Sequence, residues 1–327
     1  MNSTEPLSPP YARACWCGDP RQFAYSKEYN VCRSCGTLIS RAATSPESFA
    51  VVDDANELYS RDYWLNRQSQ KYGLPPIQQR ARLDLPERCV HWLRLLLTLK
   101  LPPARTLEIG CAHGGFVALM NWAGFVATGT EMSPWVVDYA RQIFGVDVRA
   151  GPLEGQSDLI EASFDAIILN DVLEHLPDPI QTMNTAKRLL KPDGVIVIQT
   201  PEYKEHLDFE QVAQANDPFL QHMENKNDEH LYLYSRRSTE HLWDRLGFSQ
   251  VAFEQPVFAY DLYYVVSRAP LGRRTAAEID DALLRTPAGR LVLALLDKAY
   301  ESNDRWWAVQ RLEAALEQGT RTKRQEH

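Results

Sequence analysis

Short apolar runs alternate with amphipathic helical patterns from about residue 101 onward. The runs typical of strands are RTLEIG, FVATGT, VDVRAG, FDAIILN and GVIVIQT, and segments between them, such as SPWVVDYARQIFG, place apolar residues at helical spacing. Strands that alternate with helices indicate a parallel sheet with crossover helices. Because the strands are almost continuously apolar, we expect helices on both faces of the sheet. The pattern therefore predicts an α/β protein with a doubly wound, Rossmann-like sheet.

The remaining patterns divide the chain into four predicted parts. Residues 1–45 hold a polar tail and a cysteine-rich segment, and residues 46–100 hold a linker and N-terminal helices, with an amphipathic helix over 77–98 after the Pro75–Pro76 break. Residues 101–268 carry the sheet, a polar lid at about 202–230, a helix over 236–246 and two final strands, SQVAFE and LYYVVSR. Residues 269–327 form a helical extension and a charged tail.

A glycine-rich turn follows the first strand of the predicted sheet. In LEIGCAHGG, which runs from Leu107 to Gly115, Gly110 and Gly114 allow a sharp turn and the close approach of a ligand. Glu131 ends the second strand, where an acid in a doubly wound sheet bonds the hydroxyls of a ribose. Each signal has a simpler alternative, a tight βα turn for the glycines and a helix N-terminal acid for Glu131.

With two later motifs, the chain resembles the class I S-adenosylmethionine-dependent methyltransferases over about residues 100–268. The later motifs are FDAIILNDVLEHLPDP at 164–179 and LLKPDGVIVIQTP at 189–201, and Ala112 replaces the middle glycine of the usual first motif. A Rossmann dehydrogenase does not carry the sequence LNDVLEHLPDP after its fourth strand. The resemblance implies methyl transfer with S-adenosylmethionine as the cofactor.

The resemblance also implies which residues contact the cofactor. Glu108 orients its methionine end, and Glu131 holds the ribose hydroxyls. The other implied contacts are Gly110, Cys111 and Gly114 through the backbone, Met132 and either Leu153 or Glu154 beside the adenine, Asn170 and Asp171 beside the sulfonium, and Tyr63 from an N-terminal helix folded over the cofactor.

Histidines near the carboxyl edge of the sheet are candidate catalytic bases. His175 follows the fourth strand, and His230 lies in DEHLYLYS, where similar methyltransferases place a histidine that faces the acceptor. An imidazole titrates near neutrality, so it can take the proton of a hydroxyl. The alternatives are a structural hydrogen bond for His175 and a surface position for His230. His206 and His222, in the predicted lid, are secondary candidates.

Four of the six cysteines crowd near the N-terminus, as the pairs Cys15 and Cys17, Cys32 and Cys35. Two short cysteine pairs can supply four thiolates to a tetrahedral zinc ion. A glycine follows each pair, at Gly18 and Gly36, where a positive φ helps the chain to turn. We predict a structural zinc site like that of a zinc ribbon, because four cysteines leave no open position for catalysis. A redox cluster is the alternative.

Composition and charge narrow the function. The net charge of −8 gives no general basic surface for nucleic acid. No apolar run approaches the roughly 20 residues of a membrane span, and the first residues, MNSTEPLSPP, lack the pattern of a secretory signal. We therefore expect a cytoplasmic protein without a nucleic-acid partner.

The chain is similar to methyltransferases of polysaccharide and natural-product pathways, and this resemblance, with the acidic charge, implies an enzyme that O-methylates a hydroxyl of a sugar, a glycan or another small molecule. The alternatives are an RNA base methyltransferase with a zinc-bearing N-terminus and a scaffold that has lost catalysis. The C-terminal helices, which include Trp306 and Trp307, either pack on their own domain or form a homo-oligomer interface.

Overall fold

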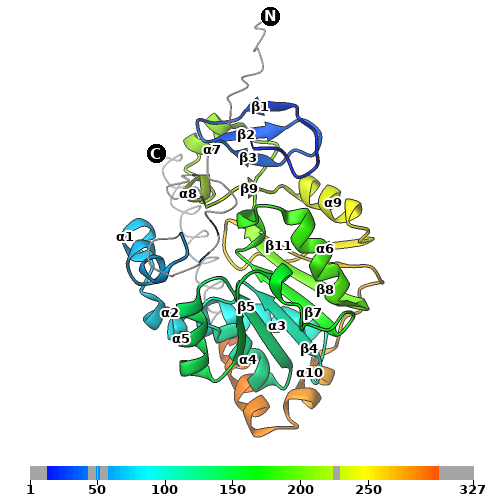
Figure 1. The fold of residues 1–327 in the computed structure, drawn as a ribbon. Coiled ribbons are helices and arrows are strands. Elements are labelled where there is room, and N and C mark those ends of the chain that lie inside the picture. The colour runs from blue at the N-terminus through cyan, green and yellow to red at the C-terminus, as the bar shows by residue number, and fades with distance from the viewer. Residues whose placement is uncertain (1–12, 43–48, 50, 52–57, 224–228, 302–327) are drawn as a thin grey trace, which may run out of the picture.

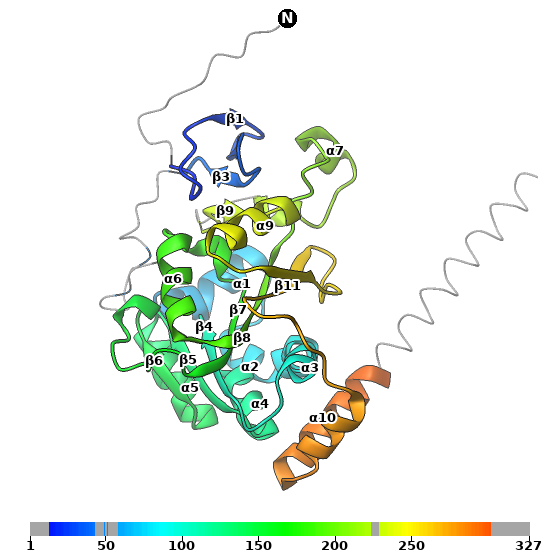
Figure 2. The same ribbon diagram turned by 90° about the vertical axis from the view of Figure 1, so that its right-hand side faces the viewer.

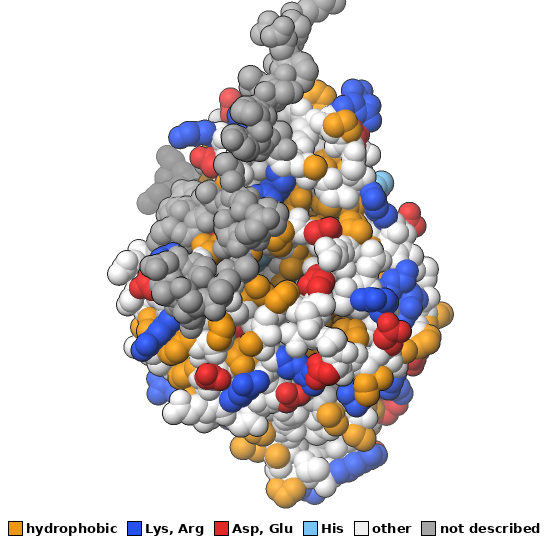
Figure 3. Space-filling model, viewed as in Figure 1, with side chains coloured by type: hydrophobic (Ala, Val, Ile, Leu, Met, Phe, Trp, Pro, Cys, Tyr) orange, Lys and Arg blue, Asp and Glu red, His pale blue; other side chains and the backbone are white. Residues whose placement is uncertain are grey.

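A computed structural model describes residues 13–42, 49, 51, 58–223 and 229–301 of the chain. A seven-stranded sheet forms its centre, and a smaller four-stranded sheet lies toward one end of the molecule (Figure 1). Hydrophobic side chains gather in the middle of the face drawn in Figure 3, beside the atoms drawn in grey. Across the described helices, none combines the length and the apolar character needed to cross a bilayer.

The large sheet has the strand order β10-β11-β8-β7-β4-β5-β6. Its strands are β4 (Arg105–Ile109), β5 (Val126–Glu131), β6 (Asp147–Ala150), β7 (Phe164–Asn170), β8 (Leu190–Pro201), β10 (Gln250–Phe253) and β11 (Asp261–Ser267). The five strands from β8 to β6 are parallel, and β11 pairs antiparallel with both β8 and β10. The predicted doubly wound sheet is confirmed. Its order reverses between β4 and β7, and in open α/β sheets such a reversal opens a ligand crevice at the carboxyl ends of the strands.

Successive residues of the inner strands pack into opposite cores, which explains why these strands are continuously apolar. In β7, Ile167 and Leu169 join the core on one face, whereas Ala166 and Ile168 join the core on the other. Both sets are fully buried. Each residue of a strand therefore meets a hydrophobic layer, as expected when both faces of a parallel sheet are covered.

Helices cover both faces of the large sheet. One core includes residues of α3 (Val90–Leu99), α4 (Gly115–Ala123), α5 (Pro134–Phe144) and α10 (Ala276–Leu283), and the other includes residues of α6 (Pro179–Leu189) and α9 (Arg236–Arg245). Local sequence sets where α5 and α6 begin. Ser133 and Asp178 accept hydrogen bonds from backbone N–H groups of the first turn, and a proline follows each of them.

The N-terminal helical segment leads up to this sheet. It consists of α1 (Gln68–Tyr72), α2 (Ile77–Asp84) and α3, with π-helical turns at Tyr63–Arg67 and Leu85–Cys89. The predicted helix over 77–98 is therefore present, but it widens locally around Pro86. Proline lacks a backbone N–H and its ring clashes with the preceding turn, so a helix that keeps an internal proline must distort.

The small sheet joins the N-terminal segment to a distant part of the chain. It is formed by β1 (Gln22–Ala24), β2 (Tyr29–Cys32), β3 (Leu38–Ser40) and β9 (Tyr232–Leu233). All neighbouring strands are antiparallel, and β9 pairs Leu233 with Leu38 and Tyr232 with Ile39. Sequence patterning did not predict β9.

The segment predicted as a lid packs against this small sheet. It contains α7 (Phe209–Gln214) and α8 (Leu220–Met223), and α7 lies beside the small sheet in both views (Figures 1 and 2). Val212, Phe219 and Met223 form one buried cluster with Tyr29 and Leu38 of the small sheet. The small sheet and the helices α7 and α8 thus share a hydrophobic core.

The C-terminal part is helical as far as the structure describes it. After α10, residues 287–301 form a second helix, and Leu283 and Val292 pack into the core that holds α3. This contact supports packing of these helices on their own domain. Leu291 stays 70% exposed. Trp306 and Trp307, on which the predicted interface partly depended, lie outside the described residues.

Candidate active site and metal centre

A cavity of about 1170 Å³ opens at the carboxyl ends of β4, β5 and β7. Its walls come from the turns that follow these strands, from the N-terminal helical segment and from the residues on either side of the gap at 224–228. The cavity therefore occupies the switch point of the sheet, where Asn170 ends β7 and Glu131 ends β5.

The turn after β4 brings backbone to the cavity wall. Gly110 has a φ of 69°, and a Cβ placed on it would lie 2.6 Å from Cγ2 of Val172. Ala112, the departure from the usual glycine pattern, also adopts a positive φ, of 45°. For an L-residue this conformation is destabilising by roughly 1–2 kcal/mol. The turn thus keeps the geometry of a glycine-rich loop although one of its positions carries a methyl group.

Gly114 was expected to line the cofactor site, but the structure places it outside the cavity wall. It is the residue before α4 and is not among the residues that form the cavity wall. With a φ of 74°, its α-carbon faces Ala140 and Val146, and a Cβ there would lie 3.0 Å from the Cβ of Ala140. Close packing of α4 against α5 and β6 thus requires the glycine.

Glu131 is buried at the end of β5 and accepts two backbone hydrogen bonds. Its Oε2 accepts from the N–H of Ala112 at 3.0 Å, and its Oε1 accepts from the N–H of Ser133 at 3.1 Å. The carboxylate therefore ties the turn after β4 to the start of α5. A carboxylate has about four lone-pair positions, so it can also accept hydrogen bonds from a diol.

Glu108 and Asn170 place unsatisfied polar atoms beside the cavity. Oε2 of Glu108 and both polar atoms of the Asn170 amide are buried and form no hydrogen bond with the described residues. Burial raises the pKa of Glu108 well above its ordinary value. Buried polar atoms are normally hydrogen-bonded, so this pair fits a ligand that brings donors and a positive charge, as the amino group of S-adenosylmethionine would.

The remaining predicted cofactor residues line the same cavity. They are Cys111, Met132, Leu153, Glu154, Asp171 and Tyr63. Burial raises the pKa of the Cys111 thiol, which agrees with a lining role rather than a nucleophilic one. Asp171 has a φ of 54°, and non-glycine residues in this conformation concentrate at functional sites.

Both candidate catalytic histidines lie on the wall of the cavity, and their rings are neighbours, tilted by 53° to one another. The ring centroids of His175 and His230 are 4.8 Å apart. Nδ1 of His175 hydrogen-bonds the carbonyl of Glu229 at 2.9 Å, and Nδ1 of His230 hydrogen-bonds the carbonyl of His222 at 2.7 Å. Burial lowers the pKa of both rings, so each is neutral at physiological pH.

His222 and His206, the secondary candidates in the predicted lid, occupy different environments. His222 also lines the cavity, 5.6 Å from the ring of His230, and burial lowers its pKa to about 3. His206 is exposed and is not part of the cavity wall. The structure thus adds His222 to the pair expected from the sequence.

Several cavity residues were missed by the sequence reasoning. Arg88 reaches from the helical segment toward Asp171, with 3.8 Å between Nη1 and Oδ2. His113 donates from Nε2 to Asp84 at 3.0 Å, because its Nδ1 accepts from the N–H of Gly115. Arg88 and Asp84 come from a helical pattern whose polar positions look ordinary, so only the fold reveals that they face the cavity.

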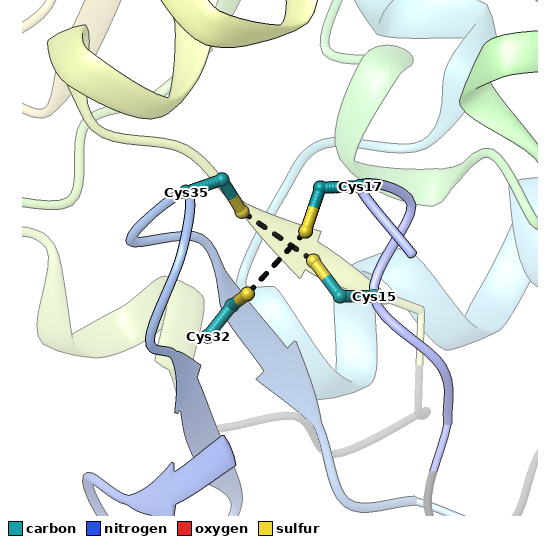
Figure 4. Close-up of side chains that lie close together, drawn as sticks. All are labelled: Cys15, Cys17, Cys32 and Cys35. Carbon is teal, nitrogen blue, oxygen red and sulfur yellow. Dashed lines mark hydrogen bonds between the residues drawn. The ribbon is translucent and has the colours of Figure 1, made fainter. Parts of the chain in front are cut away.

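The four N-terminal cysteines converge beside the small sheet (Figure 4). Their sulfur atoms all lie within 4.8 Å of one another, with 3.4 Å between Cys15 and Cys35 and 3.5 Å between Cys17 and Cys32. These distances are far longer than a disulfide bond of about 2.05 Å. They are close to the separation of about 3.8 Å between thiolates around a tetrahedral zinc ion. Gly18 and Gly36 have the predicted positive φ, at 86° and 79°.

Comparison with known proteins matches the sheet-bearing part of the chain. The family described as "Methyltransferase domain" matches residues 81–252, which is more than half of the chain. Ubiquinone biosynthesis O-methyltransferase of Xanthomonas campestris pv. campestris (strain B100) is 30% identical over 128 residues, covering 36% of this chain and 54% of that protein. The protein of the same name from Xanthomonas oryzae pv. oryzae (strain PXO99A) is 34% identical over the same coverage. The chain spans about half the length of these curated relatives.

Solved structures of similar fold include two methyltransferases. A putative S-adenosylmethionine-dependent methyltransferase from Methanococcus maripaludis is 14% identical, with a TM-score of 0.46, and the match covers 63% of this chain and 94% of that one. Magnesium protoporphyrin IX methyltransferase from Synechocystis PCC 6803 is 17% identical, with a TM-score of 0.42, and the match covers 64% of this chain and 97% of that one.

Proposed function

The chain belongs to the methyltransferase domain family, and from this membership we propose that it transfers a methyl group from S-adenosylmethionine to a hydroxyl of a small molecule. The proposal rests on one observation: a single cavity holds residues suited to bind the cofactor and residues suited to activate the acceptor. One side offers Glu108, Glu131 and Asn170, and the other offers His175 and His230.

The cofactor half fits S-adenosylmethionine, which supplies an activated methyl group when it is bound. Glu108 and Asn170 would hold the amino-acid end, because their buried polar atoms need donors and a cation. Glu131 would hold the ribose hydroxyls with its carboxylate, which the Ala112 and Ser133 amides fix at the end of β5. Met132, Leu153 and Glu154 would flank the adenine from the turns after β5 and β6.

The acceptor half supports a hydroxyl substrate. His175 and His230 are neutral and half-buried at the cavity wall, so either Nε2 can take a proton from a hydroxyl. The names of the curated relatives also describe O-methyltransferases. They give no support to a sugar in particular, so the sugar acceptor expected from the sequence enters the proposal only as one class, to be compared with phenols.

We also propose that the four cysteines bind one structural zinc ion. Cys15, Cys17, Cys32 and Cys35 form a closed set of four sulfurs, which leaves no position for a substrate. The small sheet has short strands and little core of its own, and a bound ion would compensate for this.

The first test is isothermal calorimetry with S-adenosylhomocysteine. The folded protein should bind it with micromolar affinity, about −8 kcal/mol. Glu131→Gln should weaken binding at least tenfold, because hydrogen bonds to a charged group contribute about 1.5–3 kcal/mol. Glu161→Gln is the matched control, since Glu161 is exposed and outside the cavity wall. Unchanged affinity in Glu131→Gln would remove the cofactor assignment, and no binding by the wild-type protein would favour the scaffold alternative.

The second test compares acceptor classes. A panel of sugars, nucleotide sugars and phenols is incubated with methyl-labelled S-adenosylmethionine, with RNA as the competing class. Transfer to hydroxyls supports the proposal, whereas transfer to RNA bases alone would contradict it.

A further inference from the structure

The buried tryptophans differ in whether the protein provides an acceptor for their indole N–H groups. Four tryptophans are buried in the described part of the chain, and three of them donate a hydrogen bond from Nε1. The three bonds run from Trp16 to Oγ1 of Thr37 at 2.9 Å, from Trp92 to Oε1 of Gln199 at 2.5 Å, and from Trp243 to the hydroxyl of Tyr264 at 3.2 Å. The fourth is Trp64, whose Nε1 is buried without a partner among the described residues.

The unpaired N–H of Trp64 lies at the wall of the cavity. A buried N–H without an acceptor is unfavourable, because it has lost its hydrogen bond to water and gained none in the protein. Tryptophans that are buried therefore usually find a partner for this group. Because Trp64 lines the cavity at the carboxyl ends of the strands, a bound ligand can supply the missing acceptor.

The indole of Trp64 is held in place by its neighbours. It belongs to the π-helical turn Tyr63–Arg67, and the ring of Tyr63 packs edge-on against it, with the centroids 5.2 Å apart and the planes at 88°. The hydroxyl of Tyr63 in turn donates to Oε2 of Glu229 at 2.9 Å. The position of the indole is therefore set by the protein itself, and a donor that is fixed in this way loses little entropy when it binds a ligand.

Trp64 lies on the same part of the cavity wall as the carboxylate of Glu131. Trp64 shares a buried cluster with Val136 at the start of α5, and Ala112 of the turn after β4 packs against this cluster. The backbone N–H of Ala112 donates to Oε2 of Glu131 at 3.0 Å. Both Trp64 and Glu131 line the cavity, so one ligand group can meet an acceptor and a donor here.

The chemistry of this donor and this acceptor selects the ligand group. A carboxylate only accepts hydrogen bonds and an indole N–H only donates them, whereas a hydroxyl does both. An ammonium group would suit Glu131 but offers no lone pair to Trp64, and a carboxylate would suit Trp64 but repels Glu131. A sugar hydroxyl suits both side chains.

We propose that Trp64 binds the ribose of S-adenosylmethionine, by donating its indole N–H to the oxygen of a hydroxyl whose proton is donated to Glu131. The proposal rests on the function proposed above and adds a polar contact to its cofactor half. The N-terminal helical segment then recognises the cofactor through a hydrogen bond, in addition to the packing of its aromatic rings.

The first test compares two ligands that share the ribose. Trp64→Phe removes the N–H and keeps an aromatic ring. Calorimetry is carried out with S-adenosylhomocysteine and with 5′-methylthioadenosine, which keeps the ribose and the adenine but lacks the amino-acid end. We expect about three- to tenfold weaker binding of both ligands, the factor expected for one neutral hydrogen bond. Trp122→Phe is the matched control and should bind both ligands like the wild type, since Trp122 is exposed and outside the cavity wall.

Each other result of this test overturns a defined statement. If the wild type binds S-adenosylhomocysteine and Trp64→Phe binds it equally well, the ribose contact is refuted and the proposed function stands. A loss for S-adenosylhomocysteine alone, with unchanged binding of 5′-methylthioadenosine, also refutes the contact, because the N–H would then meet the amino-acid end. If the wild type does not bind S-adenosylhomocysteine, the proposed function is refuted and the ribose contact with it.

The second test observes the hydrogen bond directly in the wild-type protein. The chain has eight tryptophans, and each gives one indole N–H signal in a proton–nitrogen correlation spectrum. The signal missing from the spectrum of Trp64→Phe belongs to Trp64, and retention of the others shows that the variant is folded. Saturation with S-adenosylhomocysteine should move the Trp64 proton signal downfield, as the gain of a hydrogen bond does, and leave that of Trp122 in place. A Trp64 signal that does not move, although the ligand is bound, would overturn the proposal.

Discussion

Replacement of Gly110 by alanine tests how rigid the turn after β4 is. The turn holds Gly110 at a φ of 69°, and a Cβ there would meet Cγ2 of Val172 at 2.6 Å. Two costs are therefore superimposed at one position, namely a left-handed backbone conformation and a steric overlap. Both can be measured separately, because the chain offers a control for each.

The magnitudes follow from these two contacts. A left-handed conformation costs an L-residue about 1–2 kcal/mol, and an extra methyl group in a packed region costs about 1–3 kcal/mol. Gly110→Ala should therefore lower the free energy of unfolding by about 2–5 kcal/mol. Gly145 has nearly the same φ, 65°, but nothing lies within 4 Å of the Cβ position. Gly145→Ala should lose only about 1–2 kcal/mol.

The assay is urea unfolding together with calorimetry. A double-mutant cycle of Gly110→Ala with Val172→Ala should show that the two losses are not additive, with a favourable coupling of about 1 kcal/mol or more. Affinity for S-adenosylhomocysteine should fall in Gly110→Ala and stay unchanged in Gly145→Ala. Equal losses of stability at the two glycines, together with an additive cycle, would refute the argument that Val172 confines the turn.

Two further predictions concern a buried acid and the cysteine cluster. Burial raises the pKa of Asp261 to about 7, above the value of about 3.9 in an unfolded chain, so the folded state holds the extra proton and the stability from this group is lost as pH rises from about 4 to about 7. Asp261→Asn should reduce that loss, which can reach about 1.4 kcal/mol per pH unit, and a stability difference that stays constant with pH would contradict the assignment. Cys32→Ser should lower the zinc content of the purified protein below the one ion per chain expected of the wild type, measured by mass spectrometry of the metal. Full retention of zinc would show that Cys32 is not a ligand.

The sheet could be predicted from the sequence because the apolar pattern that produces each strand lies within that strand. Each inner strand is apolar at successive positions, as Ile167, Ile168 and Leu169 show, and the two-sided burial of β7 requires this pattern. The four-cysteine cluster could be predicted for the same reason. The short spacing within each cysteine pair and the glycine that follows it, Gly18 or Gly36, are local features of the sequence.

Parts of the candidate site could not be predicted, because they depend on long-range packing. The two-residue strand β9 has too little pattern to signal a strand, yet it places His230 beside His175. Arg88 faces Asp171 only because the helical segment folds over the sheet. Gly114 matched the motif, but its backbone serves the packing of α4 rather than the cavity wall.

The pairing of β3 with β9 also imposes an order on events during synthesis. Leu38 and Ile39 leave the ribosome long before their partners Leu233 and Tyr232 exist. Until the later segment arrives, the edge of β3 exposes unpaired backbone groups, which are prone to pair with other chains. An ion captured early by the four thiols would hold that edge in shape while the rest of the chain is made. If the cysteines bind zinc as proposed, the nascent protein would be most exposed to aggregation when metal is scarce, even though the edge of β3 is paired with β9 in the finished protein.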